Sequence, residues 1–264
     1  MSRGRSQRVL VRHWDGRQEK RRPDDLVVEE PLTIRLDDVT VTTTMRTPGH
    51  DFELAAGFCF TEGLLADASV TSIRYCATEP AADTEFNLVT VETDGAPPPT
   101  PRLGLTTSSC GLCGAESIEA LRERLSPLPT TRAPLPADVL AAVPERVVAR
   151  QDLFGATGGV HAAAVFAADG EPILVREDIG RHNAVDKVVG RLLLDGALPA
   201  HEMGLFVSGR ASFEMVQKAW AAGFAELAAV SAPSALAVET AAAAGLRLAG
   251  FVRGGKLNFY TPSA

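Results

Sequence analysis

The sequence predicts a mixed α/β protein in which a smaller β-rich unit precedes a larger α/β half. Before residue 100, short alternating strands surround one helical pattern, whereas after Pro136 short strands alternate with helices. The chain has 264 residues, 45% hydrophobic and 22% charged, enough to bury a core without disulfides or metal. We expect a basic arm at residues 1–24, a β-rich domain at 25–130 and an α/β domain at 136–264.

The β-rich unit opens with strands at Leu32–Leu36 and Val39–Met45, which an Asp-Asp turn joins as a hairpin. Apolar residues at helical spacing predict a helix within His50–Leu65, and VTSIRYCA and EFNLVTVE alternate as two further strands. The string GAPPPTP then interrupts regular structure. Helical periodicity over Ala115–Leu125 places the preceding cysteine pair at or just before a helix N-terminus.

The α/β half alternates regularly. Its expected elements are, in order, a helix in DVLAAVPERVVARQ, strands GVHAAAVFA and EPILVRE, a helix over Asn183–Leu194, strand GLFVS, a helix over Phe213–Ala222, strand AELAAVS, a helix over Ala235–Ala244, and strands LRLAGFV and KLNFY. Alternation of this kind implies helices packed on a mixed sheet.

Charge is unevenly spread along the chain, whose formal net charge is −7. Residues 1–22 hold eight Lys or Arg and two Asp or Glu, which leaves 18 basic and 31 acidic residues, a net charge of −13, for the rest. A body this acidic argues against a general nucleic-acid surface. The basic arm is either a solvated tail or a first edge strand, and docking of a partner is a third reading.

The apolar stretches fall short of the ~20 residues that a membrane span needs, and the basic N-terminus lacks the apolar run of a secretory signal. We therefore expect a cytoplasmic protein that binds no membrane. Thiols stay reduced in that compartment. Cys59 and Cys76 lie in apolar patterns and are expected in the core, whereas Cys110 and Cys113 form a close pair.

The pair in Cys-Gly-Leu-Cys allows three chemistries. Zinc needs further ligands, which only histidines could supply, and the deaminase pattern is absent because Ala162 and Ala163 follow His161. Dithiol exchange is the second, although the preceding residues resemble a loop rather than a strand. The third is sulfur relay, in which a thiolate stabilised by a helix N-terminus takes up a persulfide sulfur. An inert pair is the remaining reading.

Three strand-to-helix junctions in the second half carry small or charged residues. REDIGRHNAVDK contains Arg181 and His182, Ser208-Gly209-Arg210 follows a second strand, and SAPSALAVE follows a third. Because strand carboxyl ends and helix N-termini converge in such folds, the junctions indicate one pocket for a phosphate-bearing ligand. The alternative for the first junction is a salt-bridged helix start capped by Asp178.

The string GFVRGGKLNFY places two cations and two glycines in a hairpin between the last two strands. Glycines let the backbone approach a ligand while the cations supply charge, although a plain turn with solvated cations has the same sequence. The cations expected to make a local anion site on the acidic body are Arg181, Lys187, Arg210, Arg253 and Lys256.

Together these strings resemble the FdhD family, sulfur-carrier accessory proteins of formate dehydrogenases. The matching strings, from Met45 to Thr261, are MRTPGHDFELAAGFCFTEGLL, TSSCGLCG, TGGVHAAA, REDIGRHNAVDKVVG, VSGRASFEMVQKAW, SAPSALAVE and GFVRGGKLNFYT. The resemblance implies that the protein takes sulfur from a cysteine desulfurase. The resemblance further implies that the protein passes this sulfur to the molybdenum cofactor in its bis-guanine-dinucleotide form, before that cofactor enters formate dehydrogenase. It also implies a homodimer and a C-terminal domain similar to the cytidine deaminase fold.

The resemblance assigns the persulfide to Cys110, with Cys113 as the second cysteine. The expected cofactor-binding residues are Phe251, Val252, Arg253, Gly254, Gly255 and Lys256, joined by Arg181, His182, Ser208, Gly209 and Arg210 from the junctions. The cofactor is a bound substrate, and neither a resident cofactor nor a metal is expected. The hypothesis is a sulfurtransferase; the alternative is a non-catalytic chaperone that binds the cofactor and formate dehydrogenase.

Overall fold

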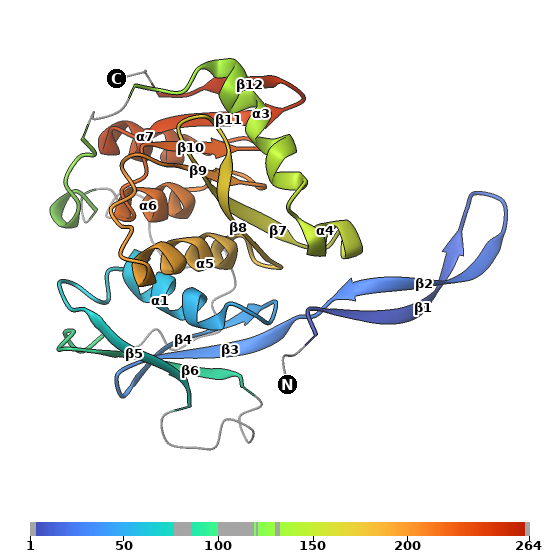
Figure 1. The fold of residues 1–264 in the computed structure, drawn as a ribbon, viewed down its shortest axis with the longest axis horizontal. Helices are drawn as coiled ribbons and strands as arrows, with labels where there is room; N and C mark the ends of the chain where they lie inside the picture. The colour runs from blue at the N-terminus through green and yellow to red at the C-terminus, as the bar shows by residue number, and fades with distance from the viewer. Residues whose placement is uncertain (1–3, 77–85, 100–118, 120, 130–132, 262–264) are drawn as a thin grey trace.

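The computed structural model describes residues 4–76, 86–99, 119, 121–129 and 133–261. Strands among these residues form three sheets, a two-stranded hairpin near the N-terminus, a four-stranded sheet and a six-stranded sheet (Figure 1). Helices cover the two larger sheets, so the expected mixed α/β class is confirmed. None of the described helices combines the length and the apolar character that a membrane crossing requires.

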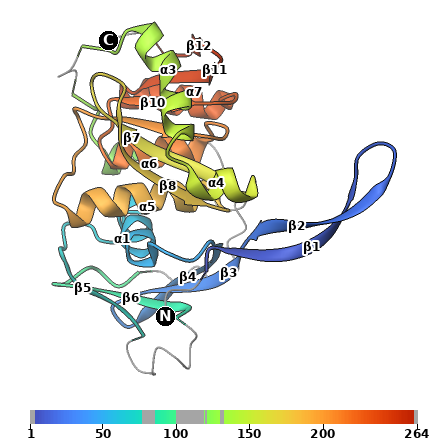
Figure 2. The same ribbon diagram turned by 45° about the vertical axis from the view of Figure 1, so that its right-hand side comes forward.

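The basic arm is a hairpin of β1 (Ser6–Trp14) and β2 (Glu19–Val27) that projects from the body in both views (Figures 1 and 2). Asp15 starts its turn by accepting hydrogen bonds from the backbone N–H groups of residues 17 and 18. The arm therefore contains the edge strand that the sequence suggested as one alternative to a solvated tail, and this strand pairs with β2 in a two-stranded sheet of its own. Leu10 and Trp14 are 66% and 63% exposed on it.

The four-stranded sheet has the order β4 (Val39–Arg46), β3 (Glu30–Leu36), β6 (Leu88–Thr93), β5 (Val70–Tyr75). The expected hairpin between β3 and β4 is confirmed, and Asp37 in its turn adopts a φ of 51°, which aspartate tolerates. Helix α1 (Asp51–Thr61) packs on this sheet, and its residues, Cys59 among them, contribute to the buried core.

The six-stranded sheet has the order β12 (Lys256–Phe259), β11 (Arg247–Arg253), β10 (Glu226–Ala229), β9 (Gly204–Val207), β7 (His161–Phe166), β8 (Pro172–Asp178). It is mixed, as predicted: β9, β10 and β11 are parallel, whereas β7 is antiparallel to both of its neighbours.

Helices cover both faces of this sheet. On one face lie α5 (Arg181–Leu194), α6 (Phe213–Ala221) and α7 (Ala235–Ala244), and on the other lies α3 (Ala137–Val148), followed by the short α4 (Asp152–Thr157). Strand side chains alternate accordingly: Ala163 and Val165 of β7 join the α5–α7 core, and Ala162 and Ala164 join the α3 core. Sequence periodicity predicted these elements, apart from α4.

Helices α1 and α5 join the two halves of the molecule, lying against each other between the two sheets (Figure 1). Their backbones touch at Gly57 and Gly190, where a Cβ on Gly190 would lie 1.8 Å from the Glu53 carbonyl oxygen.

The Glu53 carboxylate of α1 also accepts two hydrogen bonds from Arg176 of β8, at 2.6 and 2.8 Å. Burial would raise the pKa of Glu53, but the hydrogen bonds from Arg176 and from His50 outweigh it and lower this pKa to about 2. The proposed domain boundaries stay a prediction.

Candidate functional site

Several loops of the α/β half meet at one edge of the six-stranded sheet. Strand β8 runs in the same direction as β9, because both are antiparallel to β7. The carboxyl ends of β8, β9, β10 and β11 therefore share an edge with the first residue of β7. All three predicted strand-to-helix junctions lie at this edge, where α/β folds bind ligands.

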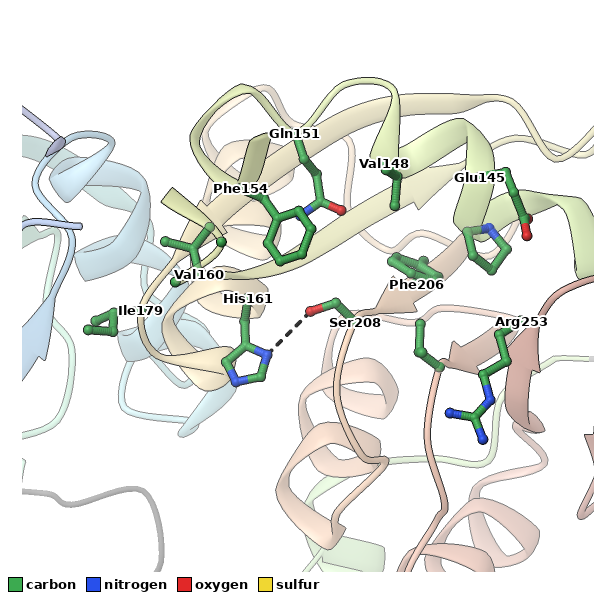
Figure 3. A pocket seen from close by; sticks show the side chains of 14 residues that line it. Glu145, Val148, Gln151, Phe154, Val160, His161, Ile179, Phe206, Ser208 and Arg253 are labelled. Carbon is green, nitrogen blue, oxygen red and sulfur yellow. Dashed lines mark hydrogen bonds between the residues drawn. The ribbon is translucent and has the colours of Figure 1, made fainter. Parts of the chain in front are cut away.

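A cavity of about 870 Å³ opens at this edge, between the sheet and the segment that joins α3 to α4 (Figure 3). Figure 3 shows His161, Ser208 and Arg253 along one side of it and Phe154, Gln151 and Val148 along the other. The remaining lining consists of Glu145 and of apolar or glycine residues: Pro144, Gly158, Gly159, Val160, Ile179, Phe206 and Val230. The cavity thus offers an apolar wall to a planar group and a polar side with one arginine.

Helix α4 holds its place in the cavity wall through Glu177, the residue before the end of β8. The Glu177 carboxylate accepts hydrogen bonds from the backbone N–H groups of Leu153 and Phe154, at 3.0 and 2.8 Å. These N–H groups belong to the first turn of the helix and have no intrahelical partner, so a carboxylate from outside completes the turn. Glu177 of the REDIGRHN string therefore positions Phe154, which is 41% exposed.

The polar side of the cavity centres on His161 and Ser208. The Nδ1 atom of His161 lies 3.3 Å from the Ser208 hydroxyl, which also accepts the backbone N–H of Ala162 at 2.9 Å. A Cβ built on Gly209 would lie 3.5 Å from Arg181 Cδ and 3.7 Å from His161 Cε1, so these side chains converge there. Burial lowers the pKa of His161, and the nearby Arg181 lowers it further. Both effects favour the neutral form of the ring.

The C-terminal hairpin brings Arg253 to the cavity. Gly254 and Gly255 form its two-residue turn with φ values of 56° and 71°, a conformation that favours glycine. Phe251 is 36% exposed and adopts a φ of 53° next to an irregular register, a strained arrangement for an aromatic residue. The Arg253 guanidinium lies 5.9 Å from the Phe251 ring centroid.

The predicted site residues do not all meet in the cavity. Of the predicted set, Ser208 and Arg253 line it, and Gly209 and Arg181 adjoin His161. Val252 is fully buried in the α3-side core, and Lys256 and Arg210 are exposed outside the lining. The remaining residues, His182 among them, are outside the lining as well; His182 Nε2 lies 3.6 Å from the Glu214 carboxylate.

The inclusion of Lys187 among the anion-site cations is wrong. Lys187 is completely buried and its Nζ lies 2.7 Å from the equally buried Asp178 carboxylate, so its charge is neutralised inside the protein. Burial lowers the pKa of Lys187. Asp178 is not the helix cap suggested by the sequence, since Gly180 occupies that position without a side-chain cap. Instead Asp178 accepts hydrogen bonds from the backbone N–H of Thr47 and from Asn183.

A second buried ion pair joins α1, α5 and α6. Lys218 donates to Asp186 at 2.8 Å, and Thr61 donates to the same carboxylate at 2.8 Å. Beside it, Arg124 donates to the carbonyl oxygens of Thr61 and Glu62, at 3.3 and 2.8 Å. Arg124 lies in the helical residues 121–124, where the sequence predicts the end of the helix after the cysteine pair. These contacts tie that segment to the junction of the two halves.

Cys110 and Cys113 lie outside the described residues. Cys59 and Cys76 are buried and free, as expected for core residues. Burial, aided by nearby carboxylates, raises the pKa of the Cys59 thiol to about 12, so it carries no thiolate at neutral pH.

The sequence-based site missed His161 and the wall formed by α3 and α4. The sequence suggests His161 only as a zinc ligand, although the Gly158-Gly159 pair before it marks a tight entry into β7. Val148 and Phe154 carry no comparable signal, because periodicity identifies an apolar side chain without showing whether it faces the core or a cavity.

Comparisons with known proteins agree on one family. A family model described as the FdhD/NarQ family matches residues 27–264, which leaves out most of the projecting arm. The chain is 51% identical over 246 residues to the "Sulfur carrier protein FdhD" of Nocardia farcinica, covering 92% of this chain and 88% of that protein. It is 50% identical over 271 residues to the protein of the same name in Streptomyces avermitilis, covering 98% and 95%.

The fold also matches a solved structure. The crystal structure of a candidate formate dehydrogenase accessory protein from Desulfotalea psychrophila superposes with a TM-score of 0.74, covering 98% of each chain at 21% identity.

Proposed function

Because the chain belongs to the FdhD/NarQ family, we propose that it is a sulfur carrier serving formate dehydrogenase. Relatives about 50% identical over nearly the whole chain are named sulfur carrier proteins, and this identity is the observation that carries the proposal. In the proposed reaction a cysteine desulfurase supplies the sulfur in the cytoplasm. The acceptor is the molybdenum cofactor in its bis-guanine-dinucleotide form, which then enters formate dehydrogenase, and the carrier works as a homodimer.

The reactive thiol in this proposal is Cys110, assisted by Cys113. Of the four cysteines, Cys59 and Cys76 are buried, and the Cys59 thiol is too basic to ionise, which leaves the close pair for thiolate chemistry. The Cys110 thiolate attacks the outer sulfur of the desulfurase persulfide, and the desulfurase cysteine leaves as its thiolate. Cys110 then holds a persulfide. The Cys113 thiolate attacks the Cys110 sulfur, the outer sulfur leaves at the sulfide level for the cofactor, and the resulting Cys110–Cys113 disulfide is reduced by a cellular thiol before the next cycle.

The cavity at the sheet edge is the proposed place for the cofactor's nucleotide part. Its apolar side chains, Phe154 and Val148, suit a planar base. Arg253 in the lining and Arg181, which adjoins His161, supply positive charge for phosphates. Gly254 and Gly255 leave the backbone beside Arg253 open, since a Cβ on either would meet nothing within 4 Å.

Persulfide loading tests this assignment. Incubation with a cysteine desulfurase and cysteine should add sulfur to the intact mass of the wild-type protein and of a Cys59→Ala control, but not to Cys110→Ala. Loading of Cys110→Ala to the wild-type level would refute the assignment. If Cys110→Ala also restored formate dehydrogenase activity in cells, the protein would be a cofactor-binding chaperone whose cysteines are incidental.

A further inference from the structure

His161 has a defined place at the sheet edge that the sequence motifs did not explain. It is the first residue of β7, and Ser208 is the first residue after the neighbouring antiparallel β9, so the two side chains meet across the strand pair. Figure 3 shows the hydrogen bond between His161 Nδ1 and the Ser208 hydroxyl on the polar side of the cavity.

The hydrogen-bond pattern fixes which ring nitrogen carries the hydrogen. The Ser208 oxygen accepts the backbone N–H of Ala162 at 2.9 Å. Within the described part of the chain, the acceptor available to the Ser208 hydroxyl hydrogen is His161 Nδ1, 3.3 Å away. A neutral imidazole that accepts at Nδ1 carries its hydrogen on Nε2. The Nε2–H group is thus a donor that the described residues leave without a partner.

The surroundings of the ring favour an anion as the acceptor for this donor. Arg181 and His161 approach each other over Gly209, and Arg253 lies on the same side of the cavity. The acidic side chains of the REDIGRHN string are already engaged: Asp178 pairs with Lys187, and Glu177 caps α4. Glu145, the acidic residue of the cavity lining, is exposed on α3 in the other wall of the cavity. A phosphate oxygen placed here would meet cationic side chains and a neutral N–H donor.

We propose that His161 is a ligand-binding residue that donates its Nε2–H to a phosphate oxygen of the bound nucleotide, with Ser208 holding the required tautomer. The inference rests on the proposed function in one respect, that the cavity takes a guanine nucleotide. It goes beyond that function by assigning a specific atom, a tautomer and a supporting residue. His161 acts through a hydrogen bond rather than through charge, in contrast to Arg253.

Matched variants separate this role from a structural one. In His161→Gln the amide nitrogen can occupy the position of Nε2, whereas in His161→Asn the shorter amide reaches only the position of Nδ1. Titration calorimetry with GDP should give His161→Gln an affinity within about threefold of wild type. Loss of a hydrogen bond to a charged group should weaken His161→Asn about tenfold or more. His201→Gln is the control, because His201 bonds the Gly223 carbonyl before β9 begins, at the other edge of the sheet.

The outcomes distinguish the inference from the proposed function. If wild type binds GDP and both His161 variants bind it equally well, the inference is overturned and the cavity assignment stands. If wild type binds no GDP, the cavity assignment itself fails and His161 loses its ligand. Nitrogen-15 NMR of the free wild-type protein gives a readout that needs no ligand: we expect Nε2 to be protonated and Nδ1 to be bare. A protonated Nδ1 on the neutral ring would overturn the inference even if the variants behaved as expected.

Discussion

Replacing Gly190 by alanine should force apart the two helices that join the halves of the molecule. A Cβ at this position would lie 1.8 Å from the Glu53 carbonyl oxygen, and real Cβ atoms essentially never approach closer than 3.0 Å. Helices α1 and α5 would have to separate locally by at least about 1.2 Å. Because the obstacle is backbone and cannot rotate away, we place the cost at the upper end of overpacking, about 3 kcal/mol.

Alanine also has a higher helix propensity than glycine, worth about 1 kcal/mol, so the net loss for Gly190→Ala is about 2 kcal/mol. For a protein of this size that lowers the melting temperature by roughly 4–8 °C. Gly155→Ala is the matched control: Gly155 lies inside α4 with nothing within 4 Å of a new Cβ, so the propensity gain should appear alone. Thermal and denaturant unfolding measure both variants. A Gly190→Ala protein as stable as Gly155→Ala would show that the helix contact is not as close as described.

Lys218→Met should destabilise the protein by about 3–5 kcal/mol, because it leaves the buried Asp186 carboxylate without its cation, and adding Asp186→Leu should recover much of the loss; denaturant unfolding checks both. The folded-state pKa of Glu53 is about 2 against an ordinary 4.5, so its stabilising contribution is complete above pH 4.5 and is lost as the pH falls towards 2. The unfolding free energy of Glu53→Gln, measured against pH, should therefore fall less steeply in that window than that of wild type. Arg253→Ala should weaken GDP binding about tenfold or more, whereas Lys256→Ala, outside the cavity lining, should change it less than twofold; equal losses in calorimetry would contradict the cavity as described.

The strands and helices were largely predictable because their signals are local. Alternation over Leu32–Leu36 and Val39–Met45, with two aspartates between them, is enough to define a hairpin. The position of the ligand edge was also accessible, since any parallel pair of strands places its strand-to-helix junctions together. The partner of a buried charge was not accessible. Lys187 resembles an exposed helix cation in the sequence. In the structure it is completely buried, and it pairs there with Asp178 at the end of the preceding strand.

The REDIGRHN string illustrates the limit further. Polar density at a strand-to-helix junction suggested ligand binding by the whole string, but Glu177 caps α4, and Arg176 pairs with Glu53 of the other half. Asn183 bonds the Met45 carbonyl, again across the halves. A polar side chain that joins two units and one that binds a ligand look alike in a sequence, because both need hydrogen bonds at a position where the chain is partly exposed. Three-dimensional contacts separate the two uses.

The most direct test of the central claim is transfer of labelled sulfur from this protein to the isolated cofactor. The wild-type protein is loaded by a cysteine desulfurase with radiolabelled cysteine, freed of desulfurase, and mixed with the molybdenum cofactor in its bis-guanine-dinucleotide form. We expect the label to move from the protein to the cofactor, Cys110→Ala to deliver none, and Arg253→Ala to load normally but to deliver slowly. Label that stays on the wild-type protein while the cofactor is bound would contradict the claim that it carries sulfur to the cofactor.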